Sequence, residues 1–255
     1  MDLKHRLNAG ETINGIMLSE LYTPNIIRIL ANCGYDYVLI DCEHGYFDLS
    51  QVANLVAVAN GIQLPIWVRV TKNSQADVVK YLDMGARGIL LANTECPAQV
   101  SDLIRMCLYA PLGDRSISTF RAHTNYRNDD MRTMMEEAND QNVIIAQIES
   151  PGAVEQIDSI MALDRLDGVL IGPNDLSLHM GMIGNYHNDQ LKNMLRKVAV
   201  SAETHNKWSG IITANEWLLR FCHHLGMCCF SSSSELNALA DGAQANLHKL
   251  LRTQQ

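Results

Sequence analysis

The chain has 255 residues, of which 47% are hydrophobic, and carries a formal net charge of −8 at pH 7. This composition is sufficient for one large core and fits a single domain over residues 1–255. The acidic balance, without a basic stripe, argues against a nucleic-acid partner, and no apolar run approaches the length of a membrane span. The seven cysteines include no zinc-like pairs, and with a polar N-terminus unlike a secretory signal they predict a cytoplasmic protein with reduced thiols.

Eight short runs rich in Ile, Val and Leu recur along the chain and predict buried strands. They span residues 13–18, 37–41, 66–70, 88–92, 143–149, 168–172, 209–213 and 227–230. A helical pattern follows each run, and such alternation implies right-handed parallel β–α–β units. Eight units in this length predict a (β/α)8 barrel. The alternative is an open doubly wound sheet, which lacks its usual early glycine-rich loop here.

Several helix ends are marked by specific residues. After a short amphipathic opening helix, the next three helices are expected from Thr23-Pro24 to Gly34, from an Asp48–Gln51 capping box to near Gly61, and from Asn73 or Ser74 to Gly85. After the fifth run, Ser150 and Pro151 have the pattern of a helix cap and first residue. The last helix is expected over 236–251, and its apolar face fits packing either on its own barrel or on a partner.

The stretch 111–130 departs from the repeat because it is long and polar. A long excursion inside a compact domain is commonly a lid or a binding loop. It carries Arg115, Arg121, His123 and Arg127. These arginines either bind a substrate carboxylate, which suits a bidentate guanidinium, or belong to a solvated loop.

Two carboxylates follow neighbouring predicted strands, at the edge where an α/β barrel forms its site. Glu149 ends the fifth run, on the same face as Gln147, and Asp175 follows the sixth. Neighbouring strands lie about 5 Å apart, so two such charges would repel and one would tend to protonate. A divalent cation such as Mg²⁺ or Mn²⁺ removes that conflict. We therefore expect a metal site here; the alternative is that Asp175 caps a helix.

Taken together, the strand-end motifs resemble the HpcH/HpaI family. The motifs are D-C-E-H at 41–44, V-R at 68–69, L-D-M-G at 82–85, Q-I-E-S at 147–150 and I-G-P-N-D-L-S at 171–177. The resemblance covers nearly the whole chain and implies a (β/α)8 barrel that acts as a class II, metal-dependent pyruvate aldolase. Such an enzyme cleaves a 4-hydroxy-2-keto acid reversibly to pyruvate and an aldehyde, through a metal-stabilised enolate. The resemblance also implies a homohexamer, a trimer of dimers, with swapped C-terminal helices.

The family's metal and pyruvate ligands carry over onto four positions. The resemblance assigns Glu149 and Asp175 to a divalent metal, which is Mg²⁺, Mn²⁺ or Co²⁺. It assigns Gln147 and the turn at Asn174 and Asp175 to the pyruvate part of the substrate. A cation chelated by a keto acid stabilises the enolate as a Lewis acid, so the chemistry agrees with this assignment.

The family's catalytic groups carry over onto the second and third strands. The resemblance makes His44 the general base and Arg69 the group that contacts substrate and stabilises the enolate. These roles suit a side chain that titrates near neutrality and a fixed guanidinium, although Arg69 could simply neutralise an acidic neighbour. A carboxylate that assists the histidine is implied at Asp83, before the fourth predicted strand; Asp41 is the alternative. No lysine lies among these motifs, which argues against a Schiff-base aldolase.

Two stretches depart from the family pattern. Relatives carry G-x-R-G where this chain has Gly113-Asp114-Arg115-Ser116, and the following Arg121-Ala122-His123 resembles the branch that cleaves 2-dehydro-3-deoxyglucarate-type sugar acids. After the eighth strand, a serine run at 231–234 replaces glycine and aspartate. Both differences concern the aldehyde half, so we expect a sugar-derived substrate. The alternatives are an oxaloacetate-type decarboxylase or acyl-coenzyme A lyase using the same site, or a barrel retained for binding only.

Overall fold

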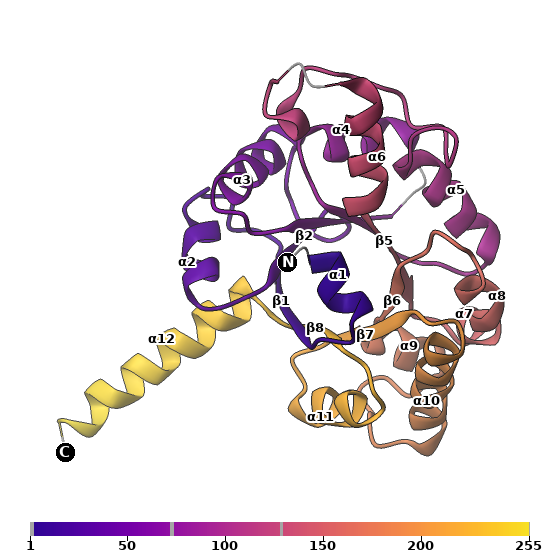
Figure 1. Ribbon diagram of the computed structural model, residues 1–255. Coiled ribbons are helices and arrows are strands. Elements are labelled where there is room, and N and C mark those ends of the chain that lie inside the picture. Colours follow the sequence, from indigo (N-terminus) through magenta and orange to yellow (C-terminus); the bar gives the residue numbers. More distant parts are fainter. Residues whose placement is uncertain (1–2, 72–73, 128–129, 255) are drawn as a thin grey trace.

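The computed structural model describes residues 3–71, 74–127 and 130–254. Its eight parallel strands close into a barrel, in chain order around the ring (Figure 1). The strands are β1 (Ile13–Leu18), β2 (Tyr37–Asp41), β3 (Ile66–Val70), β4 (Gly88–Leu91), β5 (Val143–Ile148), β6 (Gly168–Ile171), β7 (Trp208–Ile212) and β8 (Cys229–Ser234). The predicted (β/α)8 barrel is therefore confirmed, and the open-sheet alternative is wrong.

The helices mostly surround the ring, as the alternating pattern predicts, while the first lies across one end of the ring and the last extends away from it (Figure 1). They are α1 (Leu3–Asn8), α2 (Ile26–Asn32), α3 (Leu49–Gly61), α4 (Gln75–Asp83), α5 (Pro97–Cys107), α6 (Met131–Gln141), α7 (Pro151–Glu155), α8 (Ile157–Met161), α9 (Pro173–His179), α10 (Asp189–Thr204), α11 (Glu216–His224) and α12 (Glu235–Arg252). A short 3₁₀ turn, η1 (Ala122–Thr124), lies in the long polar stretch.

The predicted helix starts are largely confirmed. The Asp48 side chain accepts from the Gln51 amide at 2.8 Å, and Gln51 Oε1 accepts from the Asp48 amide at 2.9 Å, which forms the expected capping box of α3. Ser74 precedes α4, whereas Asn73 lies outside the described residues. The helix expected from Thr23-Pro24 begins later, at Ile26, because Pro24 and Asn25 form a turn before it, closed by the Ile26 amide on the Thr23 carbonyl at 3.0 Å.

The eighth strand is longer than its hydrophobic run. It starts at Cys229 and continues through the serine run to Ser234, paired with β1 as far as Met17. The eighth strand is therefore confirmed, but its predicted bounds, 227–230, are wrong, because the serine run belongs to the strand. The cause is physical: the last residues of β8 lie at the open mouth of the barrel, where polar side chains replace the apolar ones that mark a buried strand.

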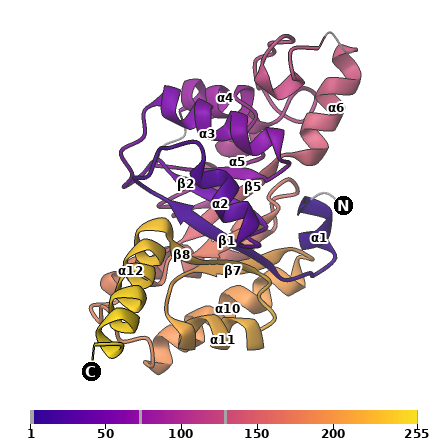
Figure 2. The same cartoon turned by 90° about the vertical axis from the view of Figure 1, so that its left-hand side faces the viewer.

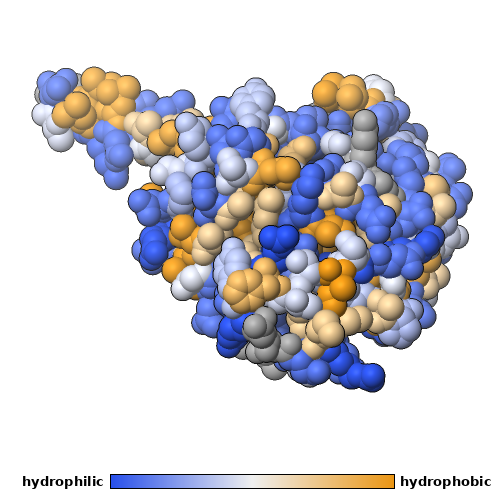
Figure 3. All heavy atoms as spheres, turned by 90° about the horizontal axis from the view of Figure 1, so that it is seen from above, coloured by the Kyte–Doolittle hydropathy of each residue, from blue (hydrophilic) through white to orange (hydrophobic). Residues whose placement is uncertain are grey.

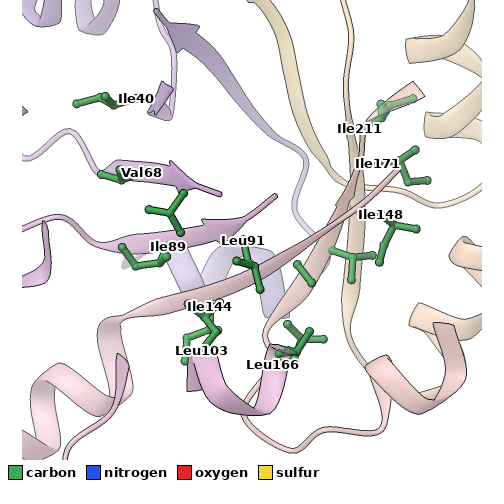
Figure 4. Packing of buried hydrophobic residues seen from close by; sticks show 14 of the residues in the cluster. Ile40, Val68, Ile89, Leu91, Leu103, Ile144, Ile148, Leu166, Ile171 and Ile211 are labelled. Carbon is green, nitrogen blue, oxygen red and sulfur yellow. The ribbon is translucent and has the colours of Figure 1, made fainter. Parts of the chain in front are cut away.

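The core has two layers, one on each side of the barrel wall. Between the strands and the outer helices lies a large apolar cluster that includes Ile40, Val68 and Ile89 (Figure 4). Inside the barrel, the ring of Trp67 stacks on Tyr37 with centroids 4.0 Å apart. Helix α1 packs onto this inner cluster (Figure 1). It closes the N-terminal end of the barrel, so the ends of the strands at the opposite mouth are the ones that can form a site.

The last helix stands away from the barrel. Helix α12 contacts β1 and β8 at its root and then extends beyond the body of the molecule (Figures 1 and 2). Exposed apolar side chains lie along it (Figure 3). They are Leu239, Leu247, Leu250 and Leu251. From the sequence, this helix is expected to pack either on its own barrel or on a partner. In the single chain these four leucines do not pack on the barrel. Within the described part of the chain, no helix is both long and apolar enough to cross a membrane.

Candidate metal and substrate site

A pocket of about 590 Å³ opens at the carboxyl ends of the strands. Six of the residues singled out in the sequence line it: Asp41, His44, Arg69, Gln147, Asn174 and Asp175. The barrel thus gathers side chains that are up to 134 residues apart in sequence from β2, β3, β5 and α9 around one cavity.

Glu149 and Gln147 lie buried at the end of β5, and only 3% and 2% of their surfaces are exposed. Gln147 Nε2 donates to Glu149 Oε2 at 2.5 Å, and the backbone amide of Asn93 donates to the other carboxylate oxygen. Ser150 Oγ accepts from the Ala153 amide at 3.0 Å and caps α7 as predicted. Strand and helix together therefore hold Glu149 in one orientation.

The protonation of Glu149 is strongly perturbed. Burial raises its pKa to about 7, and the negative charges of Glu43 and Asp175 add to the shift against the opposing effects of the Asn93 amide and Arg69. A carboxylate that resists ionisation beside two others is one that a bound cation would stabilise.

The oxygen atoms around Glu149 fit a hard divalent cation. The Oε1 atom of Gln147 is buried without a hydrogen-bond partner among the described residues. Asp175 lies in the first turn of α9, but Gly172 is the N-cap of that helix, so the alternative of a capping role for Asp175 is wrong. No group of three or more His, Cys, Asp or Glu able to hold a metal occurs in the described ranges. A cation here would thus be held by two carboxylates and completed by water or substrate oxygens.

Arg69 forms a buried ion-pair network beside this pair. Its Nε and Nη2 atoms donate to the two oxygens of Asp41 at 2.9 and 2.7 Å, and its Nη1 lies 3.3 Å from Glu43 Oε2. Burial alone would raise the pKa of Asp41, but the hydrogen bonds and charge of Arg69 outweigh it and lower that pKa. The guanidinium is therefore fixed in place at the wall of the pocket.

His44 lies at the rim, with 71% of its side chain exposed. Asp41 accepts from the backbone amide of His44 at 3.3 Å and so shapes the turn, but it shows no bond to the imidazole. The carboxylate nearest the ring is that of Glu43, whose Oε2 lies 3.8 Å from His44 Nε2. The sequence offered Glu43 as a possible ion-pair partner of Arg69, which the structure confirms, but not as the carboxylate closest to the imidazole of His44.

Asp83 lies at the end of α4 and is not among the residues that line the pocket in this chain. It accepts from Arg115 Nη2 at 2.7 Å. The same guanidinium lies 4.5 Å above the ring of Tyr109 and is almost fully buried. Arg115 therefore anchors the long polar segment to α4 within the chain, whereas Arg121 and Arg127 are exposed.

A comparison with known proteins identifies the family of the chain. The model of the family described as HpcH/HpaI aldolase/citrate lyase matches residues 16–216. The chain belongs to this family. As an HpcH/HpaI member with aldolase-named relatives, it is a carbon–carbon lyase.

The HpcH/HpaI relatives extend over most of the chain. It is 32% identical to the hydroxypyruvate/pyruvate aldolase of Pseudomonas aeruginosa, over 89% of this chain and 84% of the relative. It is 30% identical to the 4-hydroxy-2-oxo-heptane-1,7-dioate aldolase of Salmonella dublin, over 95% of this chain and 91% of the relative. The crystal structure of an HpcH/HpaI aldolase from Desulfitobacterium hafniense DCB-2 superposes with a TM-score of 0.93 at 31% identity, covering 98% of this chain and 96% of that one.

The side of the pocket remote from Glu149 is lined by hydroxyl and amide groups. Its residues come from the ends of β7 and β8 and from the root of α12: Thr213, Asn215, Ser233, Ser234 and Asn237. Tyr186 adds a phenol, which donates to Asn174 Oδ1 at 2.5 Å. Of these, only the serine run was noticed in the sequence, because single hydroxyl and amide residues after strands carry no distinctive pattern.

Proposed function

We propose that this HpcH/HpaI protein is a divalent-metal-dependent aldolase that cleaves a 4-hydroxy-2-keto acid reversibly to pyruvate and an aldehyde. The observation that carries the proposal is the buried Gln147–Glu149 pair, with the pKa of Glu149 raised to about 7 beside Asp175 and next to an open pocket. Glu149 and Asp175 would bind the cation, which is Mg²⁺, Mn²⁺ or Co²⁺. When bound, it supplies Lewis-acid stabilisation of negative charge on the keto acid.

The protein's own side chains would hold the pyruvate half. Gln147 and the turn at Asn174 and Asp175 border the pocket and offer amide groups for its carboxylate. Arg69, fixed by Asp41, would add positive charge where the enolate oxygen develops. Because that guanidinium is held before substrate binds, little reorganisation accompanies the reaction.

His44 would take the proton from the 4-hydroxyl group during cleavage and return it in condensation. Its exposure at the rim leaves the imidazole accessible to a substrate in the pocket. Three carboxylates are candidates to assist it. Glu43 is the closest in the chain, Asp41 contacts its backbone, and Asp83 would have to come from a second copy, since it does not line the pocket of its own chain.

The aldehyde half is proposed to be sugar-derived and rich in hydroxyl groups, because the remote wall carries hydroxyl and amide side chains. An acyl-coenzyme A substrate is less well supported. Among the described residues that line the pocket, Arg69 is the one permanent cation, and it is already paired with Asp41 and Glu43, so little positive charge remains for the phosphates.

Assembly and location belong to the same proposal. The exposed leucines of α12 support a homohexamer, a trimer of dimers, in which this helix packs on a neighbouring copy. The seven cysteines are all free thiols, which supports a reducing, cytoplasmic setting.

The test is metal removal and replacement. Protein stripped with a chelator is expected to lose pyruvate–aldehyde condensation, and Mg²⁺, Mn²⁺ or Co²⁺ should restore it. Glu149→Ala and Asp175→Ala should abolish both restoration and Mn²⁺ binding, whereas Glu155→Gln, at an exposed position on α7, should not. Full activity in the metal-free protein would overturn the proposal. Faster turnover of oxaloacetate than of every 4-hydroxy-2-keto acid would favour the decarboxylase alternative.

A further inference from the structure

Glu235, the first residue of α12, is a buried carboxylate that directly follows the serine run. Only 3% of its surface is exposed. Its Oε1 atom accepts from three consecutive backbone amides of the loop after β1: Ser19 at 2.8 Å, Glu20 at 2.7 Å and Leu21 at 3.2 Å. Its Oε2 atom is buried without a hydrogen-bond partner among the described residues. The side chain is thus devoted to holding this loop.

The two segments that Glu235 joins both form the pocket wall. Ser19, from the loop after β1, lines the pocket on one side of the contact. Ser234 and Asn237, on either side of Glu235 in the chain, line it on the other. All three belong to the side remote from Glu149, where the aldehyde half would lie.

The same loop also supports the turn that carries His44. The carbonyl oxygen of Ser19 accepts from the amide of Tyr46 at 3.2 Å. Gly45 packs so closely on this carbonyl that an added Cβ would lie 2.6 Å from it. A chain of direct contacts therefore runs from the root of α12, through the loop after β1, to the residues next to His44.

Helix formation does not require this carboxylate. Ser234 already caps α12, because its hydroxyl accepts from the Asn237 amide at 3.3 Å. Burying a charge is costly unless hydrogen bonds compensate it, and here the three loop amides supply them. Such an arrangement fixes the loop to the helix and leaves little freedom for either.

From these contacts we propose that Glu235 is a positioning residue for the aldehyde side of the pocket. It keeps Ser19, Ser234 and Asn237 at fixed places around the second substrate, and it leaves the metal and pyruvate ligands untouched. The inference rests on the proposed aldolase function, since the remote wall matters only if an aldehyde binds there.

The experiment measures condensation of pyruvate with glycolaldehyde by the metal-loaded protein, with a separate KM for each substrate. Glu235→Ala is expected to raise the KM for glycolaldehyde about tenfold, as the loss of well-placed charge-assisted hydrogen bonds would, and to change that for pyruvate less than about twofold. Glu235→Gln keeps an acceptor oxygen of the same reach, so it should stay within about threefold of the parent protein. Asp241→Asn, an exposed carboxylate on the same helix, is the matched control.

A second measurement is independent of activity. Hydrogen exchange of the Ser19, Glu20 and Leu21 amides should accelerate in Glu235→Ala and remain slow in Glu235→Gln. If Glu235→Ala does not fold, Glu235→Asp, with a carboxylate one methylene shorter, should show the same changes. Equal rises in both KM values, or unchanged amide exchange, would overturn the role of Glu235. A parent protein that condenses no aldehyde with pyruvate would instead overturn the proposed function. The exchange data would still show whether Glu235 holds the loop after β1.

Discussion

At the scale of single residues, the decisive feature is that several carboxylates gather at a pocket where, among the described lining residues, Arg69 is the one permanent cation. Glu149 is buried near Glu43 and Asp175, and Asn93 connects the first two: its amide donates to Glu149 and its side chain donates to Glu43 at 2.7 Å. Arg69 is near, but Asp41 already engages it. Burial first, and then the neighbouring negative charges, make the folded protein hold a proton at Glu149 below about pH 7 unless a cation replaces it.

The raised pKa of Glu149 makes the stability of the metal-free protein depend on pH. The pKa of Glu149 is about 7 when folded against an ordinary value of 4.5, so between these values the folded state binds a proton that the unfolded state does not. Stability therefore falls as pH rises through this window. With chelator present, Glu149→Gln should match the parent in thermal denaturation near about pH 5 and exceed it near about pH 8. Saturating Mn²⁺ should reverse the order by stabilising the parent alone; a difference independent of pH would contradict the argument.

His44 gives a second prediction at this scale. Because 71% of the His44 side chain is exposed and its ring approaches the carboxylate network no closer than 3.8 Å, at Glu43, His44→Ala should fold normally and bind the pyruvate analogue oxalate unchanged. Loss of a general base typically lowers kcat by about 10²–10⁴-fold. Steady-state cleavage rates and the oxalate inhibition constant measure the two effects. Parallel losses in both would mean that His44 binds substrate and does not transfer a proton.

At the scale of elements, the turn between β6 and α9 lies against two of the proposed metal and pyruvate ligands, Glu149 and Gln147. Gly172 packs directly on them: an added Cβ would lie 2.7 Å from Glu149 Oε2 and 2.9 Å from Gln147 Nε2. The backbone of Gly172 has an ordinary negative φ, so the absence of a side chain, and not conformational freedom, is what the position needs.

Gly172→Ala should therefore weaken the metal site with little loss of folding. Displaced supporting contacts typically reduce metal affinity by about 10–100-fold, which Mn²⁺ titration would measure. Gly61→Ala is the matched control, since nothing lies within 4 Å of the added Cβ at the end of α3. That variant should bind Mn²⁺ normally and gain up to about 1 kcal/mol of stability in urea denaturation. Unchanged Mn²⁺ affinity in Gly172→Ala would show that close packing at this turn does not support metal binding.

Elements with a strong local signal could be predicted from the sequence. The residues at the ends of the predicted strands then indicated the candidate site, and six of them line one pocket. Continuous apolar runs located the strands, and the Asp48–Gln51 box located a helix start, because both depend on neighbouring residues. The end of β8 could not be found, since its serines are strand residues through pairing with distant segments, β1 and β7. Likewise, the partners of Asp83 and Glu43 depend on side-chain directions that spacing does not define.

At the scale of the whole molecule, the barrel is closed by α1 at one end, open at the other, and extended by α12 to one side (Figure 2). The root of α12 forms pocket wall, while its far part exposes leucines to solvent. An apolar helix surface outside a well-packed body is destabilising in water unless something covers it. One helix, α12, thus carries both the leucines that a second copy would cover and part of the pocket wall proposed for the aldehyde half.

Assembly should consequently depend on the far part of α12. Leu247→Glu combined with Leu250→Glu places charge at positions that are 54% and 55% exposed in the single chain, so the fold should persist while association is lost. Analytical ultracentrifugation should show the parent as a hexamer and the double variant as a smaller species. Val200→Glu, at a position 60% exposed on α10, controls for added charge on an apolar surface residue and should leave the mass unchanged. A parent protein that sediments as a monomer would show that α12 has another role.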